Sequence, residues 1–273
     1  MNIAFWNINK KNLSDLLVDF VSEYEIDILL LAEAEPQTVL DFITKENIIN
    51  PSRKYYHIFD SKVTVLSSYD PNIFESKHHL VNSPRWNSYL IDIPTIIKLN
   101  LITVHFHSKV NWSEDSLALE CVNLARDIEI VEEDSGIFET LIIGDFNMNP
   151  YESGLVAANG LHALPDLNHI SKNPSGRKID GVNYKYFYNP MWNFFGDSEK
   201  PFGTHYYREP GHVSREWNIY DQVIYRAGLS KFVMNDGVKI IHQINTENLI
   251  TALNRPDRDS YSDHLPILIK LTI

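Results

Sequence analysis

Two short segments of the sequence combine side chains that suit hydrolytic chemistry. The first is GDFNMNP, residues 144–150, which follows the apolar run 141–143. Because side chains alternate along a strand, Asp145 and Asn147 would leave the end of such a strand on one side and present two oxygen-bearing groups there. The same residue types are common where a strand turns into a loop, so this segment alone favours neither a site nor an ordinary turn.

The second segment is SDHLPI, residues 262–267, just before the last apolar run. It places Asp263, a hard oxygen ligand, beside His264, a group that titrates near neutrality. This combination suits metal-assisted proton transfer. A polar turn leading into a strand explains the same residues, and for the segment taken alone that second interpretation is the stronger one.

Further polar side chains lie at or inside apolar runs. Asn7 ends the run FWN and Glu33 ends the run DILLLAE. Open sheets usually present ligand groups at such strand ends, although either residue could instead cap the following helix. Asp221 lies inside WNIYDQVIY, where an unpaired carboxylate would be unfavourable, so a partner is expected and a histidine is the natural one.

Two histidines, His105 and His107, lie two residues apart in ITVHFHS. Strand alternation predicts that they face the same side, with Val104 and Phe106 packing on the other. A single histidine on a strand is more often structural than functional, by roughly two to one.

The composition predicts an intracellular globular protein. Of the 273 residues, 44% are hydrophobic, which predicts one folded domain spanning 1–273. The single cysteine, Cys121, gives no reason to expect an oxidising compartment. The start MNIAFWNINKK lacks the features of a secretory signal, and the apolar stretch 28–32 is far shorter than the roughly 20 residues that span a bilayer. We expect a cytoplasmic location without membrane insertion.

A net charge of -12 argues against a binder that holds nucleic acid through a basic patch. It does not exclude an enzyme that meets phosphate through a bound metal, since the acidic ligands of that metal would contribute part of the charge.

Strand-like and helix-like patterns are mixed along the chain without the strict alternation of a doubly wound fold. Neighbouring runs within 55–67 predict an antiparallel hairpin, and residues 159–181 predict a loop. Together these strand-like and helix-like patterns predict a layered α/β sandwich. The predicted strands are 2–8, 27–32, 55–59, 62–67, 88–93, 97–107, 140–145, 217–225, 232–242 and 265–271, and the predicted helices are 13–23, 36–45 and 113–132.

Six motifs in order, FWNI, DILLLAE, HFHS, GDFNMNP, YDQVIY and SDHLPI, resemble those of the endonuclease/exonuclease/phosphatase superfamily, the DNase I-like proteins. The match runs from Asn7 to His264. The resemblance implies an α/β (α+β) fold, a four-layer αββα sandwich of two packed mixed β-sheets flanked by helices, with a cleft at one edge.

The resemblance also implies roles for individual residues. Asn7, Glu33 and Asp263 look like ligands of a magnesium site. Asp145 and Asn147 resemble residues that bind the phosphate region, the nucleophilic water or a second metal. His264 looks like the general acid/base or transition-state partner, and Asp221 like the carboxylate that orients it.

Three further positions lie in the motifs DILLLAE and HFHS, and two of them differ from the family pattern. His107, by its HS context, resembles the second catalytic histidine of the family. His105 stands where the family often has asparagine, and it is kept as a candidate for substrate binding. Ala32 replaces the glutamine that commonly precedes the metal-binding glutamate, which removes a polar contact and leaves Glu33 in place.

The expected reaction is hydrolysis of a phosphodiester by metal-activated water. Carboxylates and amides favour Mg²⁺ or Mn²⁺ over zinc. A nuclease is the first choice, with DNA preferred over RNA as the nucleic-acid partner. The aromatic-rich segment 184–195 could stack bases, although a core strand followed by a hydrophobic loop explains most of its side chains slightly better. Candidate substrate-binding residues are Arg85, His105, Trp192 and Arg255. Taken singly, each arginine is better explained as an ordinary solvated surface charge.

Two alternatives stay open from the sequence. A phosphatase or phosphodiesterase acting on a small molecule or a lipid head group would use the same metal chemistry, and the acidic net charge favours it slightly. A catalytically inactive binding module on the same fold is the other alternative. The full set of acids and histidines counts against it, because mutually repelling carboxylates have no purpose in a passive module.

Overall fold

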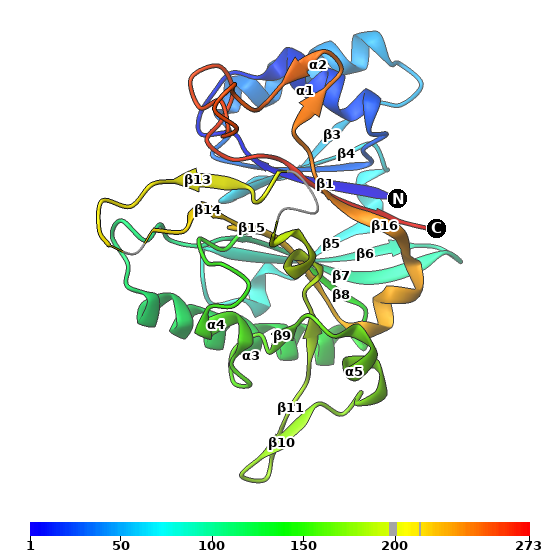
Figure 1. The fold of residues 1–273 in the computed structure, drawn as a ribbon. Helices are drawn as coiled ribbons and strands as arrows, with labels where there is room; N and C mark the ends of the chain where they lie inside the picture. Colours follow the sequence, from blue (N-terminus) through cyan, green and yellow to red (C-terminus); the bar gives the residue numbers. More distant parts are fainter. Residues whose placement is uncertain (197–200, 213) are drawn as a thin grey trace.

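Two β-sheets pack face to face, and helices cover their outer faces (Figure 1). The computed structural model describes residues 1–196, 201–212 and 214–273. The order of layers is helices, sheet, sheet, helices, which confirms the predicted αββα sandwich (Figure 1). One hydrophobic core cluster contains side chains of both sheets and of the helices that cover the first sheet, from Met1 to Leu271.

The first sheet contains six of the described strands in the order β16-β19-β1-β2-β4-β3. β1 and β2 are parallel, whereas β19 runs antiparallel to β1. The bounds are β1 Asn2–Asn7, β2 Ile28–Ala32, β3 Tyr56–Phe59, β4 Val63–Ser67, β16 Val233–Ile240 and β19 Ile267–Leu271.

The second sheet contains seven of the described strands in the order β5-β6-β7-β8-β15-β12-β9. β7 and β8 are parallel, and β15 runs antiparallel to β8. The bounds are β5 Phe74–Ser76, β6 Trp86–Ile93, β7 Ile97–His105, β8 Thr140–Asp145, β9 Ala163–Leu164, β12 Phe187–Tyr188 and β15 Asp221–Tyr225.

The remaining elements are helices and short hairpins. The helices α1 and α2 lie outside the first sheet, and α3 and α4 lie outside the second (Figure 1). Their bounds are α1 Ser14–Glu23, α2 Pro36–Ile49, α3 Glu114–Ser135, α4 Ser153–Val156 and α5 Leu167–Lys172, with short helical turns η1 Pro71–Ile73, η2 His78–Leu80, η3 Pro190–Phe194 and η4 Ala227–Phe232. The hairpin strands are β10 Arg177–Ile179, β11 Val182–Tyr184, β13 His205–Tyr207, β14 Glu216–Asn218, β17 Gln243–Ile244 and β18 Glu247–Asn248.

The helix α3 shows how local signals position a layer. Its start is capped by Ser113, whose hydroxyl accepts a hydrogen bond from the backbone N–H of Ser116 at 3.2 Å. Its end is marked by Gly136 in the left-handed conformation (φ 65°). Between them an apolar face packs against the second sheet, through the buried residues Leu117, Cys121, Leu124 and Ile128.

The strand directions bring six chain segments to one edge of the sandwich. Because β1 and β2 are parallel, Asn7 and Glu33 emerge at the same end of the first sheet. β7 and β8 carry His105 and Asp145 in register at the matching end of the second. The antiparallel strands β15 and β19 begin at this edge, so Asp221 pairs with Asp145 and the loop before β19 reaches the same place.

Gly144 permits the close approach of β8 to β7 just before this edge. A Cβ atom on Gly144 would lie 1.9 Å from the carbonyl oxygen of Val104, so any other residue would push the two strands apart. The glycine of the GDFN motif therefore allows the end of β8, which carries Asp145, to lie close to β7.

Three details of the predicted secondary structure are wrong. The run 217–225 divides into β14 and β15, because β14 pairs with β13 while β15 pairs with β8. The strand predicted over 97–107 ends at His105. The region 159–181 also contains β9, α5 and β10, which are too short to show a periodic pattern. No helix in the described part of the chain is long and apolar enough to cross a membrane.

Candidate metal and hydrolytic site

A buried histidine–aspartate pair forms the centre of the candidate site. The Nδ1 atom of His264 lies 2.8 Å from Oδ2 of Asp221. Asp221 is fully buried at the start of β15, and His264 is buried in the loop before β19. The loop is anchored to β1, since Trp6 donates its indole N–H to the carbonyl of His264 and Ser262 donates its hydroxyl to the carbonyl of Asn7.

The electrostatics of this pair favour a protonated state. Burial opposes protonation of His264, but the charges of Asp221, Asp145 and Asp263 outweigh it and raise the pKa of His264 to about 10. Burial also raises the pKa of the Asp221 carboxyl, against the opposing effect of His264. The pair therefore retains a proton at neutral pH, held between the two side chains.

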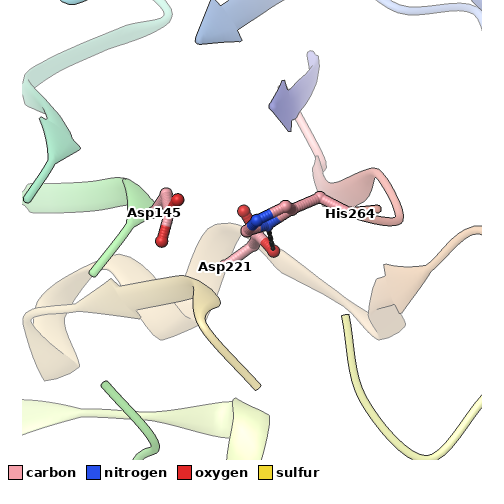
Figure 2. A group of neighbouring side chains, drawn as sticks. All are labelled: Asp145, Asp221 and His264. Atoms are coloured by element: carbon pink, nitrogen blue, oxygen red, sulfur yellow. Dashed lines mark hydrogen bonds and ion pairs between the residues drawn. The ribbon is translucent and has the colours of Figure 1, made fainter. Parts of the chain in front are cut away.

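A second buried carboxylate faces this pair. Ligand atoms of Asp145, Asp221 and His264 all lie within 4.8 Å of one another, and Figure 2 shows Asp145 opposite the hydrogen-bonded pair. Asn7 donates its side-chain N–H to Oδ2 of Asp145 at 3.2 Å. This contact joins the end of β1 to the end of β8, so both sheets contribute to one site.

Glu33 and His105 extend the site on the side of β2 and β7. The Nε2 atom of His105 lies 3.7 Å from Glu33 and 4.0 Å from Asp145. Glu33 has a positive φ of 52°, a conformation unusual for a residue other than glycine and common at functional sites. The imidazole of His105 is therefore close to the carboxylates of both Glu33 and Asp145.

Asp263 joins the site through Asn9. The side-chain N–H of Asn9 donates to Oδ1 of Asp263 at 2.9 Å, and the backbone N–H of Asn9 donates to Oδ1 of Asn7 at 3.1 Å. These two bonds tie the loop after β1 to the segment that carries His264. Asn9 does not belong to the six motifs, and it connects two of them.

Asn147 is held by the side chain of Asp145 and by the backbone of Phe106. Its own N–H donates to Oδ1 of Asp145 at 2.8 Å, and its side-chain N–H donates to the carbonyl of Phe106 at 3.2 Å. Its φ of 51° again lies in the left-handed region, which asparagine tolerates better than most residues. The turn after β8 is therefore fixed by the asparagine of the GDFN motif.

Comparison with solved structures identifies the fold that presents this site. The chain matches D. rerio TDP2 complexed with a single-strand DNA product over 100% of its length and 99% of that chain, with 17% identity and a TM-score of 0.59. It also matches an AP endonuclease from Archaeoglobus fulgidus, covering 100% of both chains, with 11% identity and a TM-score of 0.55.

A third solved structure carries the family description itself. It is an endonuclease/exonuclease/phosphatase family protein from Leptotrichia buccalis, matched over 100% of both chains with 13% identity and a TM-score of 0.56. The chain has the endonuclease/exonuclease/phosphatase fold. No protein-family model and no curated protein sequence matches it. The resemblance seen in the six motifs is therefore confirmed at the level of the fold.

On this fold, the donor atoms present suit a hard divalent cation. Glu33 and Asp145 approach the same imidazole, and Asn7 and Asp263 add further oxygens at the edge. Carboxylates and amides of this kind are the ligands that Mg²⁺ and Mn²⁺ prefer, and a cation would offset the repulsion between the acids. The Nδ1 atom of His264 is occupied by Asp221, so this nitrogen is not free to bind a metal.

The structure separates His107 from His105, against the expectation that they share one side. Since β7 ends at His105, the alternation stops there. The Nδ1 atom of His107 lies 3.0 Å from Oε1 of Glu120 on α3, and its ring stacks on Trp112 with centroids 3.8 Å apart. His105 is the histidine that lies beside the acids of the site.

The predicted substrate-binding residues other than His105 lie on separate segments of the chain. Arg85 accepts a hydrogen bond from the backbone N–H of His105 through its carbonyl, which places it beside β7. The guanidinium of Arg255 lies 5.9 Å from the ring centre of Tyr206 on β13. Trp192 lies in η3 and contacts Tyr151, a residue of the loop after β8.

His205 is a site residue that the sequence motifs missed. Its ring centre lies 4.6 Å from that of His264 and 5.2 Å from that of Tyr220. Burial, followed by repulsion from His264, lowers the pKa of His205 to about 3, so it is neutral at pH 7. The adjacent Thr204 accepts hydrogen bonds from the backbone N–H groups of Tyr220 and Asp221. The segment GTHYY, residues 203–207, resembles no motif, so the sequence does not mark His205 as a site residue. The fold brings His205 next to His264.

A cavity of about 980 Å³ lies away from these groups. It is lined by β16 and by residues around η3, including Tyr188, Phe194 and Val238, and by none of the predicted site residues. We assign the chemistry to the edge that holds the acids and histidines, because cavity size alone does not supply reactive groups.

Proposed function

We propose that this chain is a divalent-metal-dependent phosphodiester hydrolase that acts on nucleic acid, with DNA preferred over RNA. The observation that carries the proposal is the meeting of the His264–Asp221 pair with Asp145 at the edge where Asn7 also ends a strand. Buried like charges and a histidine held in one orientation are unfavourable for stability, and they suit a reaction that builds charge on phosphate.

The pair would manage the proton of the reaction. Because His264 uses Nδ1 to contact Asp221, its Nε2 is the nitrogen left to exchange a proton with the attacking water or the leaving oxygen. Asp221 keeps the ring in one tautomer and orientation, and it stabilises the imidazolium. We expect in-line attack of water on phosphorus without a covalent enzyme intermediate.

The acids at the edge would hold the cation. Asn7, Glu33 and Asp263 are the proposed ligands, with Asp145 and Asn147 facing the phosphate, the water or a second ion. When bound, Mg²⁺ or Mn²⁺ supplies charge neutralisation at the phosphate and lowers the pKa of a water molecule. His105, between Glu33 and Asp145, would keep the two carboxylates in place.

The preference for nucleic acid is supported by the similar structures. One is complexed with a single-strand DNA product and another is an AP endonuclease. The acidic net charge of -12 instead favours a small phosphate ester, so a phosphatase or phosphodiesterase acting on a small molecule or lipid head group is the second candidate. An inactive binding module is disfavoured by the buried acids.

A substrate panel tests the proposal. The pure protein is incubated with Mg²⁺ or Mn²⁺ and plasmid DNA, single-stranded DNA, RNA or inositol phosphates, with a chelator and His264→Ala as controls. We expect cleavage of DNA that both controls abolish. Activity restricted to inositol phosphates would reject the nuclease, and inertness toward every phosphoester with both metals would reject the hydrolase.

A further inference from the structure

Three aromatic side chains, from the loop after β8 and from the end of η3, form an open ledge. We define the aromatic ledge as Tyr151, Trp192 and Phe195. The ring centre of Tyr151 lies 6.4 Å from that of Trp192 and 5.6 Å from that of Phe195, and the rings of Trp192 and Phe195 are 6.0 Å apart. Tyr151 and Phe195 are each 36% exposed, so the ledge offers ring surface to solvent that a buried core would not.

A cation covers one member of the ledge. The guanidinium of Arg215, in the segment between β13 and β14, lies 5.5 Å from the ring centre of Tyr151. A positive charge next to an exposed aromatic face is the combination that attracts a flat base and its negative phosphate together.

The ledge is fixed to the loop that follows the catalytic strand. Tyr151 lies four residues after Asn147, in the loop that leaves β8. Asn149 holds this loop by accepting the backbone N–H of Ile219 and by donating to Asn218, both at 2.9 Å. Glu152 accepts the backbone N–H of Asn149 at 2.8 Å. These bonds tie the base of the ledge to the approach to β15.

Tyr220 and Lys109 connect the ledge to the hydrolytic centre. Tyr220 precedes Asp221 and stacks on His205, which in turn contacts His264. The ammonium of Lys109 lies 5.5 Å from the ring centre of Tyr220 and 2.6 Å from Glu152. Aromatic and cationic side chains therefore run from the reacting pair to the loop that carries Tyr151.

We propose that the aromatic ledge stacks an unpaired base of a single nucleic-acid strand whose phosphodiester lies at the hydrolytic site. This inference rests on the proposed function and adds the strand form of the substrate. A base inside a duplex is already stacked on its neighbours, whereas an unpaired base exposes the face that the ledge can cover. Arg215 contacts the backbone beside that base.

Equilibrium binding without turnover tests the ledge. A fluorescent single-stranded oligonucleotide and the same strand with abasic positions are titrated with the full chain in chelator and low salt, with anisotropy as the readout. We expect the wild type to prefer the strand that carries bases by roughly tenfold. Phe195→Ala and Trp192→Ala should each lose most of this preference, whereas Phe195→Trp keeps it.

Phe138→Ala is the matched control. Phe138 is 51% exposed and lies under Lys185, with 4.9 Å between the ammonium and the ring centre, so it resembles the ledge in exposure and in its cation. It should bind both strands like the wild type.

The binding and cleavage results separate the two proposals. Equal affinity of the wild type for both strands, no measurable binding of either, or an unchanged preference in both alanine variants would overturn the ledge, whether or not the protein cleaves DNA. A base preference that depends on the ledge, in a protein that cleaves no phosphoester, would retain the ledge and reject the hydrolase.

Discussion

Asp145 lies directly opposite Asp221 in the antiparallel ladder of β8 and β15, and both carboxylates are buried. Like charges in facing positions destabilise a sheet, and burial makes them more unfavourable. His264 offsets this for Asp221, while Asn7 donates one hydrogen bond to Asp145. Packing alone does not require two facing buried carboxylates, which supports a role for these residues in the chemistry.

Replacing Asp145 by asparagine should inactivate the protein and change its stability little. Asp145→Asn removes the repulsion from Asp221, but it also removes the attraction to protonated His264 and the acceptor of the Asn7 hydrogen bond. The free energy of unfolding in chelator should therefore change by less than about 1 kcal/mol, while turnover is lost. Denaturant titration and phosphodiesterase assays measure the two effects. Asp180→Asn, at an exposed turn, is the control and should change neither. A loss of more than about 3 kcal/mol in Asp145→Asn would show that Asp145 mainly stabilises the fold.

The His264–Asp221 pair should behave as one unit in kinetics. His264→Ala should lower kcat by roughly 10²- to 10⁴-fold, since a positioned acid/base group contributes that much. Because Asp221 acts through His264, the double variant His264→Ala, Asp221→Ala should be no slower than His264→Ala alone. Steady-state rates of the two single variants and the double variant give the answer. Independent, multiplying losses would show that Asp221 has a separate role.

Metal binding should stabilise the folded protein through Glu33. An ion that binds only the folded state adds about 2.7 kcal/mol at a concentration 100 times its Kd, so the Tm of the wild type should rise with added Mg²⁺ or Mn²⁺. Glu33→Gln should largely remove this shift, and Glu35→Gln, an exposed neighbour, should retain it. Thermal melts with and without metal compare the three. Equal shifts in both variants would exclude Glu33 from the metal site.

The two histidines near the end of β7 should differ in their effects. His105→Ala removes the imidazole between Glu33 and Asp145, and we expect a loss of activity of roughly 10- to 100-fold. His107→Ala breaks a contact with Glu120 on α3 and should leave kcat close to that of the wild type. The kcat values of His105→Ala and His107→Ala are compared with that of the wild type. The opposite order would restore His107 to the catalytic role that its sequence context indicates.

A buried ion pair at the far end of β8 should control stability without affecting the chemistry. Arg226 donates to Glu132 at 2.8 Å, and Thr140 donates to the same carboxylate at 2.8 Å. Glu132→Ala leaves Arg226 buried without this partner and should lower the free energy of unfolding by about 3 to 5 kcal/mol. Glu133→Ala, on the exposed face of the same helix, should change it by less than about 0.5 kcal/mol. The denaturant midpoints of the two variants measure both changes. Similar midpoints would show that the contact of Glu132 with Arg226 does not stabilise the fold.

Much of the site could be predicted because it is built from strand ends. A polar residue after an apolar run, as at Asn7, Glu33 and Asp145, is visible in sequence. The parallel pairing of β1 with β2, and of β7 with β8, brings the strand ends of each sheet together. The sandwich followed from the ordered motifs. A single domain over 1–273 and a cytoplasmic location stay predictions.

The remainder depends on contacts between distant segments. His205 reaches His264 through a hairpin that pairs β13 with β14, and no local pattern marks that pairing. The break between β14 and β15 is likewise set by two different partner strands. Asn9 contacts Asp263 across 254 positions of the chain, a distance over which a single sequence gives no pairing signal.

The most direct test of the central claim is the initial rate of cleavage of end-labelled single-stranded DNA by wild type and Asp145→Asn purified in parallel, with Mn²⁺ and with chelator. We expect cleavage by the wild type that requires the metal, and a rate at least roughly 100-fold lower for the variant. An equal rate in the two proteins, or a wild-type rate that chelator leaves unchanged, would contradict the assignment of the hydrolytic site.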